Sequence, residues 1–170
     1  MPAPEPWTAP ALAEHLRDFA SLTLPLDRWA PHRSHLAVTI VACRGRGLDD
    51  ATGIVRQGIQ ALNAVIGVPA SAYHETVTRL YVAVVHAMVR ESDTGQPDAD
   101  LVNLLTARLG ASREERLRMW AHYYRDPEAV LASDAARTGW VPPDRGSALP
   151  DWLCGDQPPA TTPSGSVERR

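Results

Sequence analysis

The sequence predicts an all-α fold: a single compact domain of six or seven helices with a disordered C-terminal tail. Three observations lead to this prediction. Apolar residues recur at helical spacing over most of the 170 residues, helix-capping signals precede several of these stretches, and alternating strand patterns are weak. The helical domain is expected over residues 1–154, and the tail, rich in proline and small polar residues, over residues 155–170.

The first two helices are bounded by Thr8 and by prolines. Thr8 is a suitable N-cap for a helix that continues to about Leu22, because a threonine hydroxyl can accept from the free amides of the first turn. The proline-containing segment 24–31 then ends that helix. Pro31 is favoured in the first turn of a second helix, which continues to about Cys43 and stops at the glycines that follow.

The third and fourth helices have the clearest apolar stripes. Asp49 or Asp50 is expected to cap the third helix, which ends at Gly67. Ser71 is expected to begin the fourth and longest helix, which runs to about Glu91. Apolar residues repeat every three or four positions along both helices, so each is predicted to pack one face against the core.

Three further helices are expected in the second half of the chain. The fifth spans residues 98–109. Ser112 and Glu115 have the spacing of a capping box and predict a sixth helix that continues to about Tyr124. The seventh is expected over residues 126–138, with an aspartate as its cap.

Chemistry that needs a lysine is excluded by composition, because all 17 basic residues are arginine. Schiff-base catalysis on a lysine, a lysine that anchors pyridoxal phosphate and the lysine of a phosphate-binding P-loop are all ruled out. The formal net charge of −3 argues against nucleic acid as the main partner. No nucleic-acid partner is therefore expected.

The sequence contains no segment typical of a membrane or secretory protein. The longest apolar stretch, residues 81–89, is interrupted by His86 and is far shorter than the ~20 residues that a membrane span needs. The N-terminus lacks the basic and apolar regions of a signal peptide. Two cysteines, Cys43 and Cys154, make no disulfide framework, so a cytoplasmic protein without a membrane partner is expected.

Several polar side chains lie on helix faces that should pack inward. At 100° per residue, the second helix places His32 and His35 on one side. The fourth helix places His74 and Thr78 in its apolar stripe, with Glu75 on the flank. A buried polar group without a partner costs about 1–3 kcal/mol, so these groups are expected to face one another. Two aromatic residues just upstream of histidines would wall the resulting pocket: Trp29 and Tyr73.

Each of these features also has a purely structural interpretation. An inward histidine is usually a hydrogen-bonded core residue, so the cluster could simply satisfy itself in the core. Arg56, at the edge of the third helix's apolar stripe, could belong to a solvated face, or it could clamp a carboxylate that fits its guanidinium fork. Cys43 is expected to be an inert core thiol.

Five motifs, in order within residues 12–150, resemble those of a widespread, mostly uncharacterised bacterial family of small helical proteins. They are Phe19-x5-Pro25-x3-Trp29, His32-x-x-His35-Leu36, Arg56-x-Gly58-Ile59-x3-Asn63, Tyr73-His74-Glu75-Thr76 and Ala136-Arg137-x-x-Trp140-Val141-x-Pro143-Asp144. The spacing from Trp29 to His32 departs from the family by one additional residue. Through this family the chain is similar to the streptonigrin-type Pictet–Spenglerases of natural-product biosynthesis.

The resemblance implies an enzyme that condenses an indole-bearing amine such as tryptophan with an aldehyde, and closes a ring at indole C2 without a cofactor. Glu75 is then expected to be the acid or base, with a pKa raised by its apolar surroundings. His74 and His35 are expected to orient groups or relay protons. The residues expected to bind the substrate are Arg56, which would hold its carboxylate, and Trp29, Tyr73, Thr78 and His32.

Two alternatives remain open at this point. In the first, the three histidines and a carboxylate bind zinc or non-haem iron, for which these ligand types are suited. Against it, His74 and Glu75 are adjacent on the expected helix and would rarely bind one ion. In the second, the protein is a non-catalytic helical binding protein or homodimer built on the apolar face of the fourth helix, and its histidines satisfy one another.

Overall fold

The computed structural model describes residues 5–25, 31–92, 95–109 and 112–146. These ranges contain eight α-helices and one short 3₁₀ helix, and no strand. The α-helices are α1 (Ala9–Ala20), α2 (Pro31–Cys43), α3 (Leu48–Val65), α4 (Glu75–Glu91), α5 (Asp98–Arg108), α6 (Arg113–Tyr123), α7 (Pro127–Ala132) and α8 (Asp134–Thr138), and the 3₁₀ helix is η2 (Ala70–Ala72). The predicted all-α single domain is confirmed.

The capping signals read from the sequence account for most helix starts. Thr8 is the N-cap of α1, and its hydroxyl accepts from the backbone N–H of Ala11 at 3.3 Å. At α6 the expected capping box is present: Ser112 accepts from the N–H of Glu115, and the Glu115 carboxylate accepts from the N–H of Ser112. These bonds satisfy amides that a helix start otherwise leaves without partners.

Two helix starts differ from the prediction. The N-cap of α3 is Gly47, and Asp49 and Asp50 lie in the first turn instead, where carboxylates are favoured by the helix dipole. The fourth helix begins at Glu75 rather than at Ser71, which lies in η2. His74 occupies the N-cap position of α4, so it precedes the apolar stripe in which it was expected.

The predicted seventh helix is two helices. Ser133 separates α7 from α8 and caps the latter, its hydroxyl accepting from the N–H of Ala136 at 3.3 Å. This break explains why the described part of the chain has eight α-helices rather than six or seven. The predicted tail at 155–170 lies outside the described residues, as does the boundary at residue 154.

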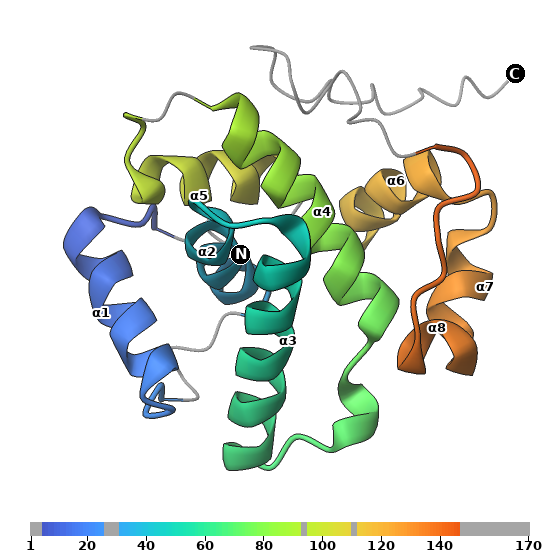
Figure 1. Cartoon of the computed structure of the whole chain (residues 1–170), viewed down its shortest axis with the longest axis horizontal. Coiled ribbons are helices and arrows are strands. Elements are labelled where there is room, and N and C mark those ends of the chain that lie inside the picture. The colour runs from blue at the N-terminus through green and yellow to red at the C-terminus, as the bar shows by residue number, and fades with distance from the viewer. Residues whose placement is uncertain (1–4, 26–30, 93–94, 110–111, 147–170) are drawn as a thin grey trace, which may run out of the picture.

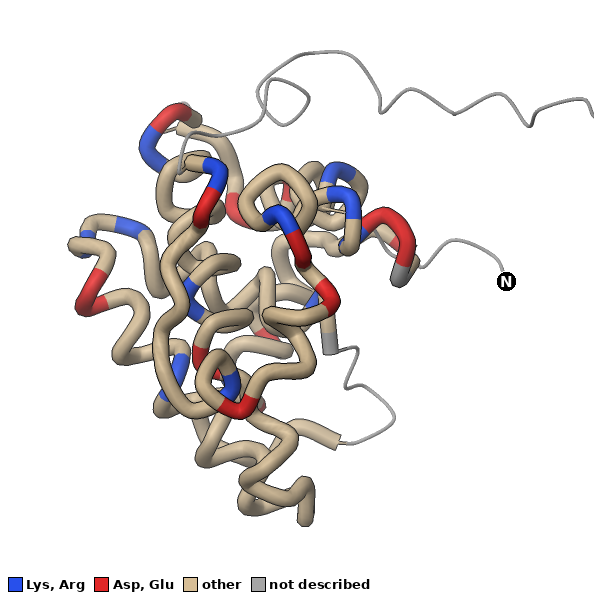
Figure 2. Tube along the Cα trace, turned by 90° about the vertical axis from the view of Figure 1, so that its right-hand side faces the viewer, with Lys and Arg blue, Asp and Glu red and all other residues tan. Residues whose placement is uncertain are grey.

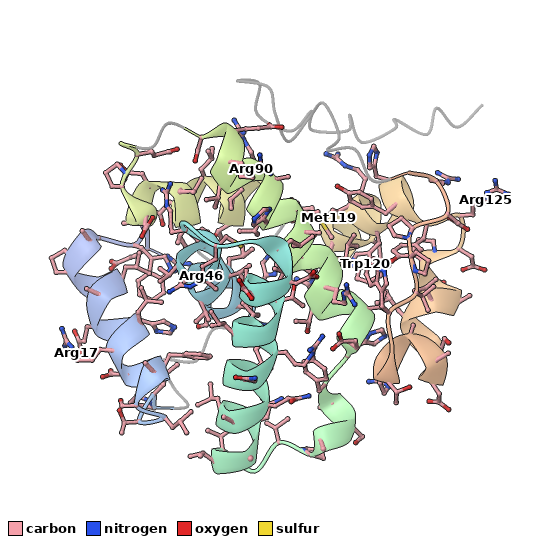
Figure 3. The ribbon with its side chains drawn as sticks, viewed as in Figure 1. Arg17, Arg46, Arg90, Met119, Trp120 and Arg125 are labelled. Atoms are coloured by element: carbon pink, nitrogen blue, oxygen red, sulfur yellow. The ribbon has the colours of Figure 1, made fainter. Side chains whose placement is uncertain are left out.

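Helix α2 lies at the centre of the molecule and contacts α3, α4 and α5 (Figure 1). In Figure 1, α1 lies at the left edge of the molecule, α3 lies between α1 and α4, and α7 and α8 lie beyond α4 at the right. The buried Met119 and Trp120 of α6 point inward and belong to the core (Figure 3). Arg17 and Arg125 point away from the molecule. The apolar face of α4, considered above as a dimer surface, packs against α2 and α3 of the same chain.

A buried threonine fixes the segment after α8 beside the start of α4. The Thr76 hydroxyl donates to the carbonyl of Gly139 at 2.8 Å and accepts from the N–H of Val141 at 3.0 Å. Trp140 lies between these two bonded positions, with the guanidinium of Arg79 over its ring, 5.1 Å from the centroid. The aromatic residue is thereby held next to the first turns of α4.

Charged residues of both signs are interspersed along the described chain, as the blue and red segments of Figure 2 show. None of the described helices is both long enough and apolar enough to cross a membrane.

Candidate functional site

A cavity of about 670 Å³ opens where α2, α3, α4 and α6 meet the loop before α4. Three of the lining residues are His32, His35 and His74, and we call it the His cavity. Apolar side chains make up part of its wall: Leu36, Val55, Ile59, Val68, Ala72 and Val77. The remaining polar wall consists of Thr39, Asn63, Tyr73, Thr78, Tyr81 and Arg116. A mainly apolar cavity of this size with a few convergent polar groups is typical of a small-molecule site.

The first two histidines come from neighbouring turns of α2, as the His-x-x-His spacing predicts. Burial, and to a smaller extent the positive charge of Arg116, lowers the pKa of His32 to about 4. Burial and the proximity of His32 likewise lower the pKa of His35 to about 4. Both imidazoles are therefore neutral at pH 7. The ring of His32 meets that of Tyr81 edge-on, with centroids 5.6 Å apart.

His74 reaches the cavity from the N-cap of α4. Its Nδ1 accepts from the backbone N–H of Val77 at 3.3 Å, which leaves the proton of the neutral ring on Nε2. Burial lowers the pKa of His74, a hydrogen bond with the backbone of Leu131 in α7 opposes that shift, and the charge of Arg137 adds to it. His74 is thus a helix cap whose ring also interacts with the backbone of α7.

Glu75 does not line the His cavity. It lies in an adjoining hollow of about 630 Å³, the Glu75 hollow, whose wall also includes Arg56, Tyr73 and Trp140. The Arg56 guanidinium donates to both carboxylate oxygens of Glu75, and the Tyr73 hydroxyl donates to Oε2 at 2.8 Å. The guanidinium of Arg56, which was predicted to hold a substrate carboxylate, therefore binds the carboxylate of Glu75 in the same chain.

The expected rise in the pKa of Glu75 is wrong. Burial alone would raise it, but the hydrogen bonds from Arg56 and Tyr73 and the charge of Arg56 outweigh burial and hold the pKa below its usual value. Glu75 is accordingly an ionised group at neutral pH, positioned by two donors. Helical periodicity correctly predicted that Glu75 lies beside an apolar face, but it could not predict that Arg56 of another helix lies against the carboxylate.

Tyr73 connects the two spaces, because its side chain lines both the His cavity and the Glu75 hollow. Burial raises its pKa, and hydrogen bonding with Thr78, another wall residue of the His cavity, opposes that rise. A chain of polar side chains thus runs from Thr78 through Tyr73 to Glu75 and Arg56. The structure brings together all the predicted site residues that it describes, in these two adjoining spaces; Trp29 lies outside the described residues.

Four polar residues of the cavity wall were not among the predicted site residues: Thr39, Asn63, Tyr81 and Arg116. Tyr81 was assigned to the apolar stripe of α4, where its ring indeed lies, and its hydroxyl adds a polar group to the cavity. Arg116 belongs to a stretch rich in arginine and glutamate that resembles a solvated helix face. One feature of the sequence could have indicated that Arg116 faces inward. It lies three residues before Met119, which is buried, and residues three apart lie on the same face of a helix.

Within the described ranges, no three His, Cys, Asp or Glu side chains come together in an arrangement that could hold a metal ion. Cys43 is buried and is not disulfide-bonded, and burial raises the pKa of its thiol to about 12. A thiol with so high a pKa is almost wholly protonated at neutral pH, which agrees with the predicted inert core cysteine.

Fold and site together define a small all-α protein with a histidine-lined cavity of ligand size. Comparison with known proteins identifies no relative: no protein-family model, no curated protein and no solved structure matches the chain. The resemblance described from the five motifs therefore stays a prediction. Two residues of these motifs do lie close together: a Cβ added to Gly58 would lie 2.9 Å from the ring of Phe19.

The ion pair between Arg56 and Glu75 is expected to stabilise the fold measurably. Glu75 is only 8% exposed, so Arg56→Met would leave a buried carboxylate with Tyr73 as its one remaining donor. We expect a loss of about 2 kcal/mol in the free energy of unfolding, less than for a fully buried pair because the Arg56 side chain is 37% exposed. Urea denaturation of the Arg56→Met, Glu75→Gln and double variants should give a coupling energy of about 1–2 kcal/mol.

The pair between Arg44 and Asp98 is the matched control. Its atoms Nε and Oδ1 are 2.9 Å apart, but the carboxylate belongs to a far more exposed side chain. The same cycle with Arg44→Met and Asp98→Asn should give a coupling energy below about 1 kcal/mol. Equal coupling in the two cycles would contradict the assignment of Glu75 as a carboxylate held by its buried surroundings.

Proposed function

We propose that the protein is a small-molecule enzyme of bacterial specialised metabolism that catalyses a Pictet–Spengler condensation. In this reaction an indole-bearing amine related to tryptophan joins an aldehyde and closes a new ring, with the His cavity as the active site. The observation that carries the proposal is a pair of imidazoles, His32 and His35, kept neutral at the wall of a mainly apolar cavity. Such groups are ready to accept a proton from a bound apolar substrate at neutral pH.

In the first step, no group of the protein forms a covalent bond with the substrates. A substrate ammonium and an aldehyde give an iminium ion and one water, so the positive charge passes from the ammonium to the iminium. Because the chain has no lysine, the nitrogen must be the substrate's own. The tyrosine rings of Tyr73 and Tyr81 at the cavity wall suit the cation, since an aromatic face attracts positive charge.

The second step closes the ring. Indole C2 bonds to the former aldehyde carbon, and the iminium nitrogen takes up the π pair and becomes a neutral amine. The ring cation that results then loses its C2 proton to a base and regains aromaticity. This cation is so acidic that an imidazole with a pKa near 4 is basic enough; what the step requires is that the imidazole is unprotonated when the substrate arrives. His35, deep on α2, is the base in this proposal, and His32 lies beside it.

The remaining predicted residues have positioning roles in this proposal. His74 and Tyr73 shape the wall of the cavity, and Thr78 adds a hydroxyl to it. Glu75 and Arg56 act on Tyr73 from the adjoining hollow, fixing its hydroxyl and hence its ring. Glu75 is assigned to positioning rather than to acid–base catalysis because it is held ionised by two donors outside the His cavity.

The proposal is tested by incubating the full chain with L-tryptophan or tryptamine and a small aldehyde such as acetaldehyde. Products separated by chiral chromatography and mass spectrometry should contain a tetrahydro-β-carboline formed faster than in a sample without protein, with one configuration at the new C1 centre favoured beyond the ratio of the protein-free reaction. The protein-free ratio of configurations at C1, formed at the uncatalysed rate for every amine and aldehyde pair tried, would reject a Pictet–Spengler enzyme.

A further inference from the structure

The Glu75 hollow is a second ligand-sized space beside the His cavity, and the proposed reaction leaves it without a ligand. Its volume is about 630 Å³, and its wall comes from α3, η2, α4, α8 and the segment that follows α8. Three of the wall residues are exposed, so a ligand can enter from solvent: Gln60, Ser71 and Thr138. Small-molecule sites are spaces of this size in which a few polar groups converge.

The charged wall residues of this hollow are Arg56, Arg137 and Glu75. Arg56 already has a partner, because it donates to both carboxylate oxygens of Glu75. Arg137 of α8 forms no ion pair with any carboxylate in the part of the chain that the structure describes; it donates instead to the backbone carbonyl of Ser71. The described wall therefore retains one positive charge, that of Arg137, which favours a ligand with one negative charge.

Arg137 is held in place at the edge of the hollow. Its Nη1 donates to the carbonyl of Ser71 at 2.9 Å, which ties α8 to η2, and both residues line the space. A guanidinium carries five N–H groups, so those that the bond to Ser71 does not use can donate to both oxygens of a carboxylate. An anchor that is already positioned binds its ligand at a lower cost in conformational entropy.

Trp140 gives the hollow an aromatic wall three residues after this cation. The hydroxyl of Thr76 bonds to the backbone on both sides of Trp140, and the guanidinium of Arg79 lies over the indole, 5.1 Å from the ring centroid. These contacts fix the position of the indole. Tyr73 adds a second aromatic side chain to the same wall. The ring of a ligand can pack against such side chains in an offset or edge-to-face arrangement.

We propose that the Glu75 hollow is a second binding site, for a small aromatic carboxylate, with Arg137 as its anion anchor and Trp140 as its aromatic wall. This site goes beyond the proposed function, because its ligand lies outside the His cavity and takes no part in ring closure. The planar guanidinium suits a carboxylate, since two parallel N–H groups can donate to its two oxygens. A neutral molecule of the same shape lacks this interaction and is bound more weakly.

Benzoate and its neutral counterpart benzamide test the site, with binding to the full chain measured by isothermal titration calorimetry at pH 7.5. The wild-type chain should bind benzoate about 10-fold more tightly, the low end of the range for charge-assisted hydrogen bonds, because Arg137 is only partly buried. Arg137→Gln should remove this preference. Arg145→Gln is the matched control and should keep it: Arg145 also donates through Nη1 to a backbone carbonyl, that of Ala121 at 2.9 Å, but lies outside the hollow. Urea midpoints establish that both variants are folded.

The place where benzoate binds is read from the indole N–H of Trp140 in ¹H–¹⁵N spectra. The variant Trp140→Phe identifies this resonance as the one that it removes. Saturating benzoate should shift the Trp140 resonance of the wild-type chain, and the same concentration should shift it much less in Arg137→Gln.

Four outcomes would overturn the inference: no preference for benzoate in the wild-type chain, a preference that survives in Arg137→Gln, an equal loss of preference in Arg145→Gln, or a Trp140 resonance that does not move. Neither probe can undergo ring closure, so the test is separate from turnover. A chain that binds benzoate in the Glu75 hollow but forms no tetrahydro-β-carboline would keep the second site and reject the proposed reaction.

Discussion

Between pH 6.5 and pH 4 the protein is expected to lose about 3 kcal/mol of its free energy of unfolding for each of His32 and His35. The folded-state pKa of each is about 4, whereas that of an unperturbed histidine is 6.5. In this range the unfolded chain binds protons that the folded chain does not, so unfolding becomes easier as the pH falls. Stability from this source is complete above pH 6.5 and is lost progressively down to the folded-state pKa.

Urea denaturation at half-unit steps from pH 7 to pH 4.5 measures this loss. The upper part of this pH range reports on the histidines alone. The pKa of Glu75 is lowered in the folded protein, so its ionised form stabilises the fold above the unfolded-state pKa near 4.3. That contribution is lost only below this pH. His35→Leu should remove the part of the decline that His35 contributes and leave the parts from His32 and His74, and His122→Gln, which changes an exposed histidine of α6, should leave the whole decline intact. A free energy of unfolding that stays constant from pH 7 to pH 4.5 would show that the imidazoles are not held neutral.

Local signals in the sequence were sufficient to predict a helix start wherever the capping residues lie within that helix's own first turn. Thr8, Pro31 and the pair Ser112 and Glu115 mark helix starts because capping uses side chains within three positions of one another. The fourth helix was placed too early because Ser71 also looks like a cap. Ser71 instead lies within the 3₁₀ helix at 70–72. The N-cap of α4 is His74, a residue type that is not among the preferred N-caps.

The candidate site could be predicted only in part, because its residues come from five separate segments. Helical periodicity placed His32 and His35 on one inward face, and both line the cavity. Periodicity could not show that Arg56 lies opposite Glu75, since that contact depends on how α3 crosses α4. The same limit applies to Arg116, whose neighbours in the sequence are mostly exposed and whose place at the cavity follows from the packing of α6.

Replacing the proposed base is expected to slow ring closure by 10²- to 10⁴-fold, the usual contribution of a positioned proton-transfer group. The variant His35→Gln keeps a neutral, hydrogen-bonding side chain of similar length but cannot accept the indole C2 proton. The effect should fall on kcat with little change in KM, because the cavity wall that binds the substrate is otherwise the same. His122→Gln, outside the cavity, should retain the wild-type kcat, and the urea midpoints of both variants at pH 7.5 establish that they are folded.

The isotope effect on the C2 proton separates a base from a structural residue. With His35 in place, loss of the C2 proton is expected to be fast, so tryptophan deuterated at indole C2 should react at nearly the same rate as ordinary tryptophan. Without the base, deprotonation becomes the slowest step, and His35→Gln should show a clear preference for the protiated substrate. If His35 only shaped the cavity, its loss would slow iminium formation or C–C bond formation, and the deuterated substrate would keep pace with the ordinary one in the variant. A slow variant without an isotope effect would therefore leave His35 a structural role and move the search for the base to His32, the other neutral imidazole on α2.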